Sequence, residues 1–315
     1  MSSTTLELAL RRRNRRSQRA AWEEPPSLVG KAGKATTLAI VVAVVLVPLW
    51  TIVITSLSPQ SSINRAGGLV VIPEGITFAA YQRIFDNELV THSLWVSTWT
   101  TVVGTALSLV VTILCAYGLS HARSFGHRII LGFLVITMFF NGGLIPFFLV
   151  VTALGGYDNL WSLIVPSSIS VFNIIVMRSF FANTAQELMD AAKIDGAGHW
   201  RTLWSVVLPT SRPVVAVIAL FYAVGYWNTW FNALLFLRSN EKWPLQQVLY
   251  TYTYQANPMP GTGATNTGQY YGHQEIAPLA IRMAVVVLTL VPILLVYPLI
   301  QRHFAKGMLL GAIKG

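Results

Sequence analysis

The chain has 315 residues, of which 54% are hydrophobic and only 11% are charged, and its mean hydropathy is +0.56. Soluble domains carry roughly 25% charged residues, so this chain cannot cover a water-exposed surface and is expected to lie in lipid. The net charge of +10 would suit nucleic acid. However, the basic residues lie in short segments between long apolar runs, which is the pattern of membrane topology and argues against a nucleic-acid partner.

Six apolar segments reach the length of about 20 residues that a membrane-spanning helix needs, and none alternates with period 2. They predict an all-α fold, a polytopic membrane helix bundle with six transmembrane helices. The first apolar segment is too long for the core of a signal peptide and is interpreted as a retained span. The predicted spans are Thr37–Leu57, Ser93–Leu119, Ile129–Leu154, Leu160–Phe181, Pro213–Leu237 and Pro278–Ile300.

The basic residues predict that both termini are cytoplasmic. With the N-terminus inside, 17 of the 22 Lys and Arg residues fall in or beside inner segments. The N-terminal segment 1–36 contains an arginine run and is expected to be partly disordered against anionic lipid. The predicted permease domain covers 37–300, with an inner loop at 182–212, outer loops at 58–92 and 238–277, and an inner tail at 301–315.

Ionisable groups avoid the middle of the predicted spans. No Asp, Glu or Lys lies there, and all six histidines flank spans or lie in loops. Proton-coupled carriers and metal transporters usually place such groups at depth, so the pattern disfavours both and predicts no bound metal. The single cysteine, Cys115, allows no disulfide within the chain. Arg282 is expected to reach the membrane interface, with a substrate or partner contact as the alternative.

The inner loop 182–212 carries the most informative pattern. Thr184 and Glu187 form a capping box that predicts a helix start, and Gly196 is placed to end that helix. A second helix is predicted over 198–207, stopped by Pro209. Its predicted apolar stripe consists of Trp200, Leu203, Trp204 and Val207. Physics alone leaves two interpretations open, a passive connection between spans and a docking surface for another protein.

This loop resembles the EAA motif of ABC importer permeases, a helix–Gly–helix that docks on a cytoplasmic ATPase. The motif spacing is kept, with Asp190 in place of Glu and Val206 in place of Ile. The resemblance favours docking over a passive connection. It implies an ATPase-coupling site formed by Glu187, Asp190, Ala191, Ala192, Asp195, Gly196, Ala197, Leu208 and Pro209.

Three further segments resemble carbohydrate-uptake permeases, namely 141–146, 227–231 and the ending 306–315. The resemblance covers roughly residues 35–315 and is closest to the smaller maltose permease type and to permeases for oligosaccharides or polysaccharide fragments. It implies a bacterial inner-membrane protein with a second, heterologous permease, two ATP-binding subunits, an extracytoplasmic solute-binding protein and a carbohydrate substrate. It also implies no catalytic residue and no cofactor in this chain, since ATP and Mg are used by the ATPase.

A substrate path is expected along span five. Plotted at about 100° per residue, one sector of this span holds Tyr222, Gly225, Asn228, Thr229 and Asn232, whereas Trp227 and Phe231 point away. Such a sector suits a sugar path, or alternatively hydrogen bonding between helices. In span three, Asn141-Gly142-Gly143 with Pro146 interrupts the helix, which suits a hinge facing the pore or, alternatively, close helix packing by glycine. Asn141 is assigned to the path.

Other functions fit the sequence less well. A peptide or amino-acid importer is the main alternative within the transporter class. A polytopic membrane enzyme would need a catalytic arrangement of ionisable residues, and the sequence offers no P-loop, nucleophile elbow or paired carboxylates. A secondary carrier would need midplane charges or inverted repeats. Neither the enzyme nor the carrier explains the helix–Gly–helix loop.

Overall fold

A computed structural model describes residues 27–312, except 87, 122–123, 141, 185, 255–268, 272–273 and 277. The chain divides into two compact units, Met1–Thr51 and Ile52–Gly315. The predicted N-terminal segment, residues 1–36, lies largely outside the described residues, which begin at residue 27. In the first unit, the described part is most of α2 (Leu28–Ser56), which begins well before the predicted start at Thr37. Its side chains between Leu38 and Trp50 are apolar and mostly exposed, as expected for a helix surrounded by lipid.

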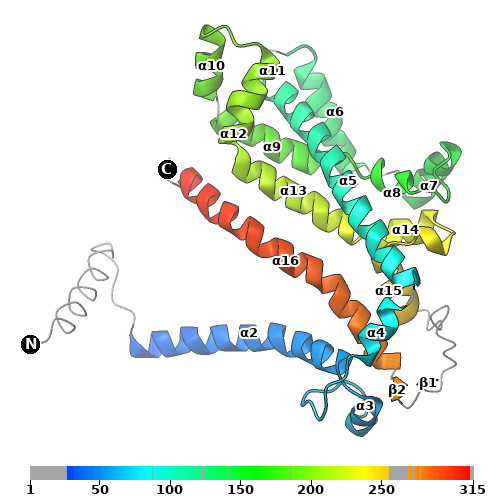
Figure 1. The fold of residues 1–315 in the computed structure, drawn as a ribbon. Coiled ribbons are helices and arrows are strands. Elements are labelled where there is room, and N and C mark those ends of the chain that lie inside the picture. The colour runs from blue at the N-terminus through cyan, green and yellow to red at the C-terminus, as the bar shows by residue number, and fades with distance from the viewer. Residues whose placement is uncertain are drawn as a thin grey trace, which may run out of the picture. The chain divides into compact units, whose positions relative to one another are not determined.

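The second unit is built around α5 (Glu88–Ser120), the green-cyan helix at the centre of Figure 1. It packs against α13 (Arg212–Trp227) and α9 (Val171–Thr184), and α13 packs in turn against α16 (Pro278–Ala312). The face of α5 that is buried here carries small and hydroxyl side chains at helical spacing, which lets neighbouring helices approach closely. These residues are Ser93, Ser97, Thr100, Gly104, Ser108 and Thr112.

Predicted span three is interrupted as expected. Helix α6 (His127–Phe139) ends before the glycine pair, and α7 (Leu144–Ala153) begins after Gly143. Gly143 has a φ of +86°, a conformation that residues with a β-carbon rarely adopt. Asn141, which was assigned to the substrate path, lies outside the described residues.

Predicted span four is not one continuous helix, contrary to expectation. The chain forms a single turn, α8 (Trp161–Ile164), then turn and extended backbone up to α9. Pro166 lacks the N–H that a continuous helix would need. The Ser168 hydroxyl and amide both donate to the Val165 carbonyl, at 2.7 and 3.1 Å, which stabilises the turn at the break.

Predicted span five also divides in two, contrary to the sequence analysis. Helix α13 ends at Trp227 and α14 (Trp230–Phe236) follows. The Asn228 side chain donates to the Val224 carbonyl at 2.9 Å, a carbonyl that also accepts the Asn228 backbone amide at 3.1 Å. The break redirects the chain between Asn228 and Trp230.

The predicted loops after span one and span five contain structure of their own. The first holds α3 (Gln60–Ala66) and α4 (Ala79–Phe85). The second holds the 3-10 turn η2 (Asn240–Lys242), α15 (Leu245–Tyr254) and two strands, β1 (Gln269–Tyr271) and β2 (Gln274–Ile276). The strands pair antiparallel with Tyr270 opposite Glu275, a small exception to the all-α prediction.

Among the described residues, α2 and α5 are each long and apolar enough to cross a membrane. Two bent pairs would raise that number to four if each counted as one span, namely α6 with α7, and the 199–210 helical segment with α13. Two shorter apolar stretches lie in α9 and α16. The protein is thus a helical membrane chain with several candidate spans.

Candidate functional site

The loop between α9 and α13 begins with α10 (Gln186–Ile194). The predicted capping box lies at its start, but the side chains of Thr184 and Glu187 are outside the described set. At its end, the Ala197 amide donates to the Ala192 carbonyl at 2.9 Å and the Gly196 amide to the Lys193 carbonyl at 3.0 Å. This bond pair with a φ of +76° at Gly196 is a Schellman motif, and it ends α10 where the sequence predicts.

Some of the predicted coupling residues in α10 and in the turn after it are buried, and others are exposed. Met189 and Ala192 are buried, and Met189 packs in the cluster that contains Phe181 of α9. Asp190, Ala191 and Asp195 are exposed. Asp190 pairs with Lys193 at 3.1 Å on the open surface, where such a pair contributes little to stability.

The second helix of the loop differs from the prediction in two ways. It runs as α11 (His199–Thr202), a π-helical turn η1 (Leu203–Val207) and α12 (Leu208–Thr210), so Pro209 does not stop it. A π-turn directly before Pro209 accommodates the ring and its missing N–H. The predicted stripe is also divided, because Leu203 and Val207 are 1% and 0% exposed while Trp200 and Trp204 are 66% and 64% exposed.

Four large apolar side chains of this loop are therefore exposed. The carboxylates of Asp190 and Asp195 in the same loop are also exposed. We call this set the outward face of the loop; its apolar members are Leu188, Ile194, Trp200 and Trp204.

The loop is attached to the C-terminal end of α5. The Tyr117 hydroxyl donates to the His199 carbonyl at 3.1 Å, and the His121 ring lies edge-on to Tyr117 and to His199, with centroids 4.9 and 5.7 Å away. At the other end of α5, the Ser97 hydroxyl accepts the Leu245 amide of α15 at 2.7 Å. The loop α10–α12 and the α15 segment thus lie at opposite ends of the 33-residue helix α5 (Figure 1).

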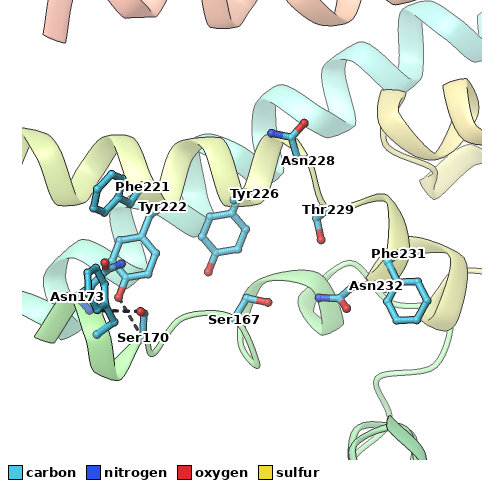
Figure 2. Close-up of a pocket in the computed structure, with 12 residues that line it drawn as sticks. Ser167, Ser170, Asn173, Phe221, Tyr222, Tyr226, Asn228, Thr229, Phe231 and Asn232 are labelled. Carbon is cyan, nitrogen blue, oxygen red and sulfur yellow. Dashed lines mark hydrogen bonds between the residues drawn. The ribbon is translucent and has the colours of Figure 1, made fainter. Parts of the chain in front are cut away.

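A pocket of about 550 Å³ opens between α13–α14 and the segment that links α8 to α9. Figure 2 shows the hydroxyl groups of Tyr222, Tyr226 and Thr229 directed toward the segment that carries Ser167 and Ser170. All twelve lining residues are uncharged. They are Ser167, Ser170, Phe172, Asn173, Phe221, Tyr222, Gly225, Tyr226, Asn228, Thr229, Phe231 and Asn232.

Two buried tyrosines fix the walls of this pocket to α5. Tyr222 shares a hydrogen bond of 2.7 Å with Thr112 and accepts the Ser170 amide at 3.2 Å. Tyr226 shares one of 2.8 Å with Ser108 and donates to the Ile164 carbonyl at 3.0 Å. Each hydroxyl therefore joins three segments that are distant in the sequence.

The five residues predicted for one sector of span five all line this pocket. The expectation that Phe231 points away is wrong, because Phe231 lines the pocket too; the break after α13 re-aims it. Figure 2 shows the Asn228 amide extending away from Ser167 and Asn232. That amide donates to Val224 and accepts from Gln246 at 3.4 Å.

The sequence analysis missed the opposite wall, which is formed by Ser167, Ser170 and Asn173. These residues carry a signal that could have been used. Together with Ser168 they put four polar side chains into an apolar run directly after Pro166, which is where a broken span would expose them. Trp227, predicted to point away, is buried and donates to the Thr289 carbonyl of α16 at 3.0 Å.

Comparison with known proteins identifies the class. Residues 108–310 match the family described as binding-protein-dependent transport system inner membrane component. The chain belongs to this family, and it is an inner-membrane permease subunit of a binding-protein-dependent ABC importer. Members work with an ATPase and a solute-binding protein, so the chain is a transport subunit without a cofactor of its own rather than an enzyme.

Two curated relatives and one solved structure are similar over most of the chain. The polygalacturonan/rhamnogalacturonan transport system permease protein YtcP of Bacillus subtilis (strain 168) is 43% identical over 247 residues, 78% of this chain and 85% of YtcP. Protein LplC of the same organism is 39% identical over 273 residues, 87% of this chain and 90% of LplC. These matches confirm the resemblance to carbohydrate-uptake permeases inferred from the motifs.

The solved structure is a bacterial ABC transporter involved in the import of the acidic polysaccharide alginate. One of its chains superposes with a TM-score of 0.82 at 31% identity, covering 90% of this chain and 100% of that chain. The helical arrangement described above is therefore the arrangement of an importer subunit.

Proposed function

We propose that this chain forms half of the translocation pathway for an oligosaccharide, and that the pocket between α13–α14 and the α8–α9 link is part of that pathway. The observation that carries the proposal is the pocket lining, which combines hydroxyl and amide groups with aromatic rings and contains no charge. Sugars present hydroxyl groups at their edges and apolar C–H faces, so they need donors and acceptors beside aromatic surfaces.

The relatives support an oligosaccharide derived from a polysaccharide. The two names above that state a substrate refer to polygalacturonan/rhamnogalacturonan and to the acidic polysaccharide alginate. An uncharged wall can bind the hydroxyl groups of such a chain but cannot neutralise its carboxylates. If the substrate is acidic, basic groups must come from the second, heterologous permease. A peptide or amino-acid substrate is less well supported, because the relatives whose names state a substrate transport carbohydrates.

The loop α10–α12 is proposed to couple the pathway to the ATPase. Its outward face exposes two tryptophans and two aliphatic side chains on a segment expected in water, where large exposed apolar groups indicate a protein partner. Gly196 lies at the tip, where an added β-carbon would have nothing within 4 Å in this chain, so the tip is open to a partner. The proposed complex holds two ATP-binding subunits and one extracytoplasmic binding protein.

The proposed topology has six spans and two cytoplasmic termini. In this arrangement the α10–α12 loop is inside, and the segments at the other end of α5, including η2 and α15, are outside. The distribution of basic residues supports this orientation. The length of α5, about 50 Å at 1.5 Å per residue, is enough to separate the two sides.

Asn232→Ala tests the pathway. In proteoliposomes that hold the whole complex and its binding protein, we expect slower uptake of labelled oligogalacturonides while assembly and basal ATP hydrolysis stay unchanged. Asn228 also lines the pocket, but its amide bonds to Val224 and Gln246, so Asn228→Ala is expected to lower the stability of the complex instead. Normal uptake by Asn232→Ala would contradict the pathway, and a preference for short peptides over the oligogalacturonides would contradict the substrate class.

A further inference from the structure

The chain segments that form the two walls of the pocket also contact each other beyond one end of the pocket. One wall is the α8–α9 link with Ser167 and Ser170, and the other is the α13–α14 segment with Thr229 and Asn232. Asp158 lies in the link between α7 and α8, shortly before the first wall. The residues that follow α14, from Leu237 to Lys242, come shortly after the second wall.

The Asp158 side chain joins these two stretches. Its Oδ1 accepts the amides of Arg238 and Ser239 at 3.0 and 2.9 Å. Its Oδ2 accepts the Ser239 hydroxyl at 2.7 Å and the Lys242 ammonium group at 3.1 Å. The ammonium group also donates to the Asp158 carbonyl, and the Asp158 amide donates to the Phe236 carbonyl at 2.7 Å. We call this set the Asp158 clamp.

Electrostatics and backbone geometry both indicate that the clamp holds firmly. The Ser239 hydroxyl and amide, with Lys242 and the Arg238 amide, hold the pKa of Asp158 well below its usual range. The carboxylate is therefore charged at neutral pH, and charge-assisted bonds are the stronger kind. Asp158 also has a φ of +54°, the one positive φ of a non-glycine residue in the described part of the chain. Such geometry persists only where surrounding contacts over-determine it.

Packing extends the clamp to the walls themselves. Leu163 of α8 and Ala233 of α14 are fully buried in one small cluster with Leu237. Phe236 at the end of α14 stacks on Phe148 of α7, with centroids 5.9 Å apart. A change of position at Asp158 would therefore be transmitted to both walls of the pocket.

We propose that Asp158 is a positioning residue that fixes the separation of the two pocket walls at their outer end and thereby sets which substrates the pathway accepts. This inference rests on the proposed function, because it takes the pocket to be part of the sugar path. None of the clamp residues is among those that line the pocket, so the clamp acts on substrate only through the walls.

Spin labels across the clamp test the positioning role directly. In a Cys115→Ser background, labels at Asn159→Cys and Asn240→Cys, both exposed, report the distance between the two stretches in the intact complex. We expect a narrow distribution in the parent and a broad one in Asp158→Ala. Asp158→Asn keeps the shape and tolerates the positive φ, but its amide cannot accept from Ser239 and Lys242 at Oδ2. Asp158→Asn should broaden the distance distribution partly, and it replaces Asp158→Ala in this test if Asp158→Ala fails to assemble.

Uptake by the same unlabelled variants tests the consequence. With a labelled oligogalacturonide ladder, we expect Asp158→Asn and Lys242→Met to shift the preferred chain length and to slow uptake severalfold, with ATPase binding unchanged. The matched control is Glu241→Gln, an exposed carboxylate outside the clamp. An unchanged label distribution, or uptake identical to that of Glu241→Gln, would overturn the inference. Asn232→Ala leaves the clamp intact, so uptake by this variant tests the pathway proposal independently of the inference about Asp158.

Discussion

The hydroxyl groups of Tyr226 and Ser108 lie 2.8 Å apart, and this bond fixes the pocket-bearing helix α13 to α5 across 118 residues of sequence. The contact is possible because Gly104 lies one turn before Ser108. A β-carbon at residue 104 would lie 2.7 Å from the Tyr226 ring, closer than real β-carbons come to other atoms. The pocket wall therefore depends on one glycine in a different helix.

Gly104→Ala is expected to destabilise the solubilised complex, since Tyr226 is buried and must move. Overpacking of this kind costs about 1–3 kcal/mol. The matched control is Gly118→Ala in the same helix, where an added β-carbon would have nothing within 4 Å. Thermal unfolding of the two variants beside the parent measures the difference. Equal melting temperatures for the two variants would contradict the packing described.

The exposed tryptophans of the loop give a second prediction. Trp200→Ala and Trp204→Ala should weaken co-purification of the ATPase with little effect on the stability of the permease, since both side chains are largely exposed. Leu203→Ala should do the opposite, because Leu203 is buried and a Leu→Ala truncation in a core costs about 2–5 kcal/mol. Pull-down yield and thermal stability, measured on the same preparations, separate the two effects. If a tryptophan variant still co-purifies with the ATPase, that tryptophan is not part of the interface.

Orientation gives a third prediction. In a Cys115→Ser background, single cysteines at Asn240 and Ser124 are expected on opposite sides of the membrane, since the first lies beyond span five and the second between spans two and three. A membrane-impermeant maleimide should label residue 240 in intact spheroplasts and residue 124 only after permeabilisation. The reverse pattern would contradict cytoplasmic termini.

Local chemistry explains which features the sequence could predict. The Schellman motif at Gly196 needs only a helix and a glycine within six residues, so the sequence is sufficient. The interruption before Gly143 is local in the same way. Membrane residence follows from composition, because too few polar residues are available for a water-exposed surface.

Features that depend on tertiary contacts could not be predicted. The split of the stripe, with Leu203 inside and Trp204 outside, depends on which side of the helix meets α9 and α13. The break at Asn228 directs Phe231 into the pocket, whereas in a continuous helix Phe231 would point away from it. Asp158 could not be predicted, because its side-chain partners lie 80 to 84 residues later and only the fold brings them together.

Gly196 offers the most direct test of the central claim, that the loop α10–α12 couples ATP hydrolysis to transport. Its φ of +76° suits glycine and, at modest cost, asparagine, whereas valine adopts it only with strain. Nothing in this chain lies within 4 Å of an added β-carbon. Gly196→Asn therefore introduces bulk at the tip without disturbing the permease, and Gly196→Val adds backbone strain.

The decisive measurement is the number of oligosaccharide molecules imported per ATP hydrolysed, with ATPase co-purification determined on the same membranes. We predict that Gly196→Asn inserts and pairs with the second permease normally, yet either loses the ATPase or hydrolyses ATP without import. Gly196→Val should have the same defect. Normal import per ATP by both variants would contradict the account, because the loop would then be a passive connection between two spans.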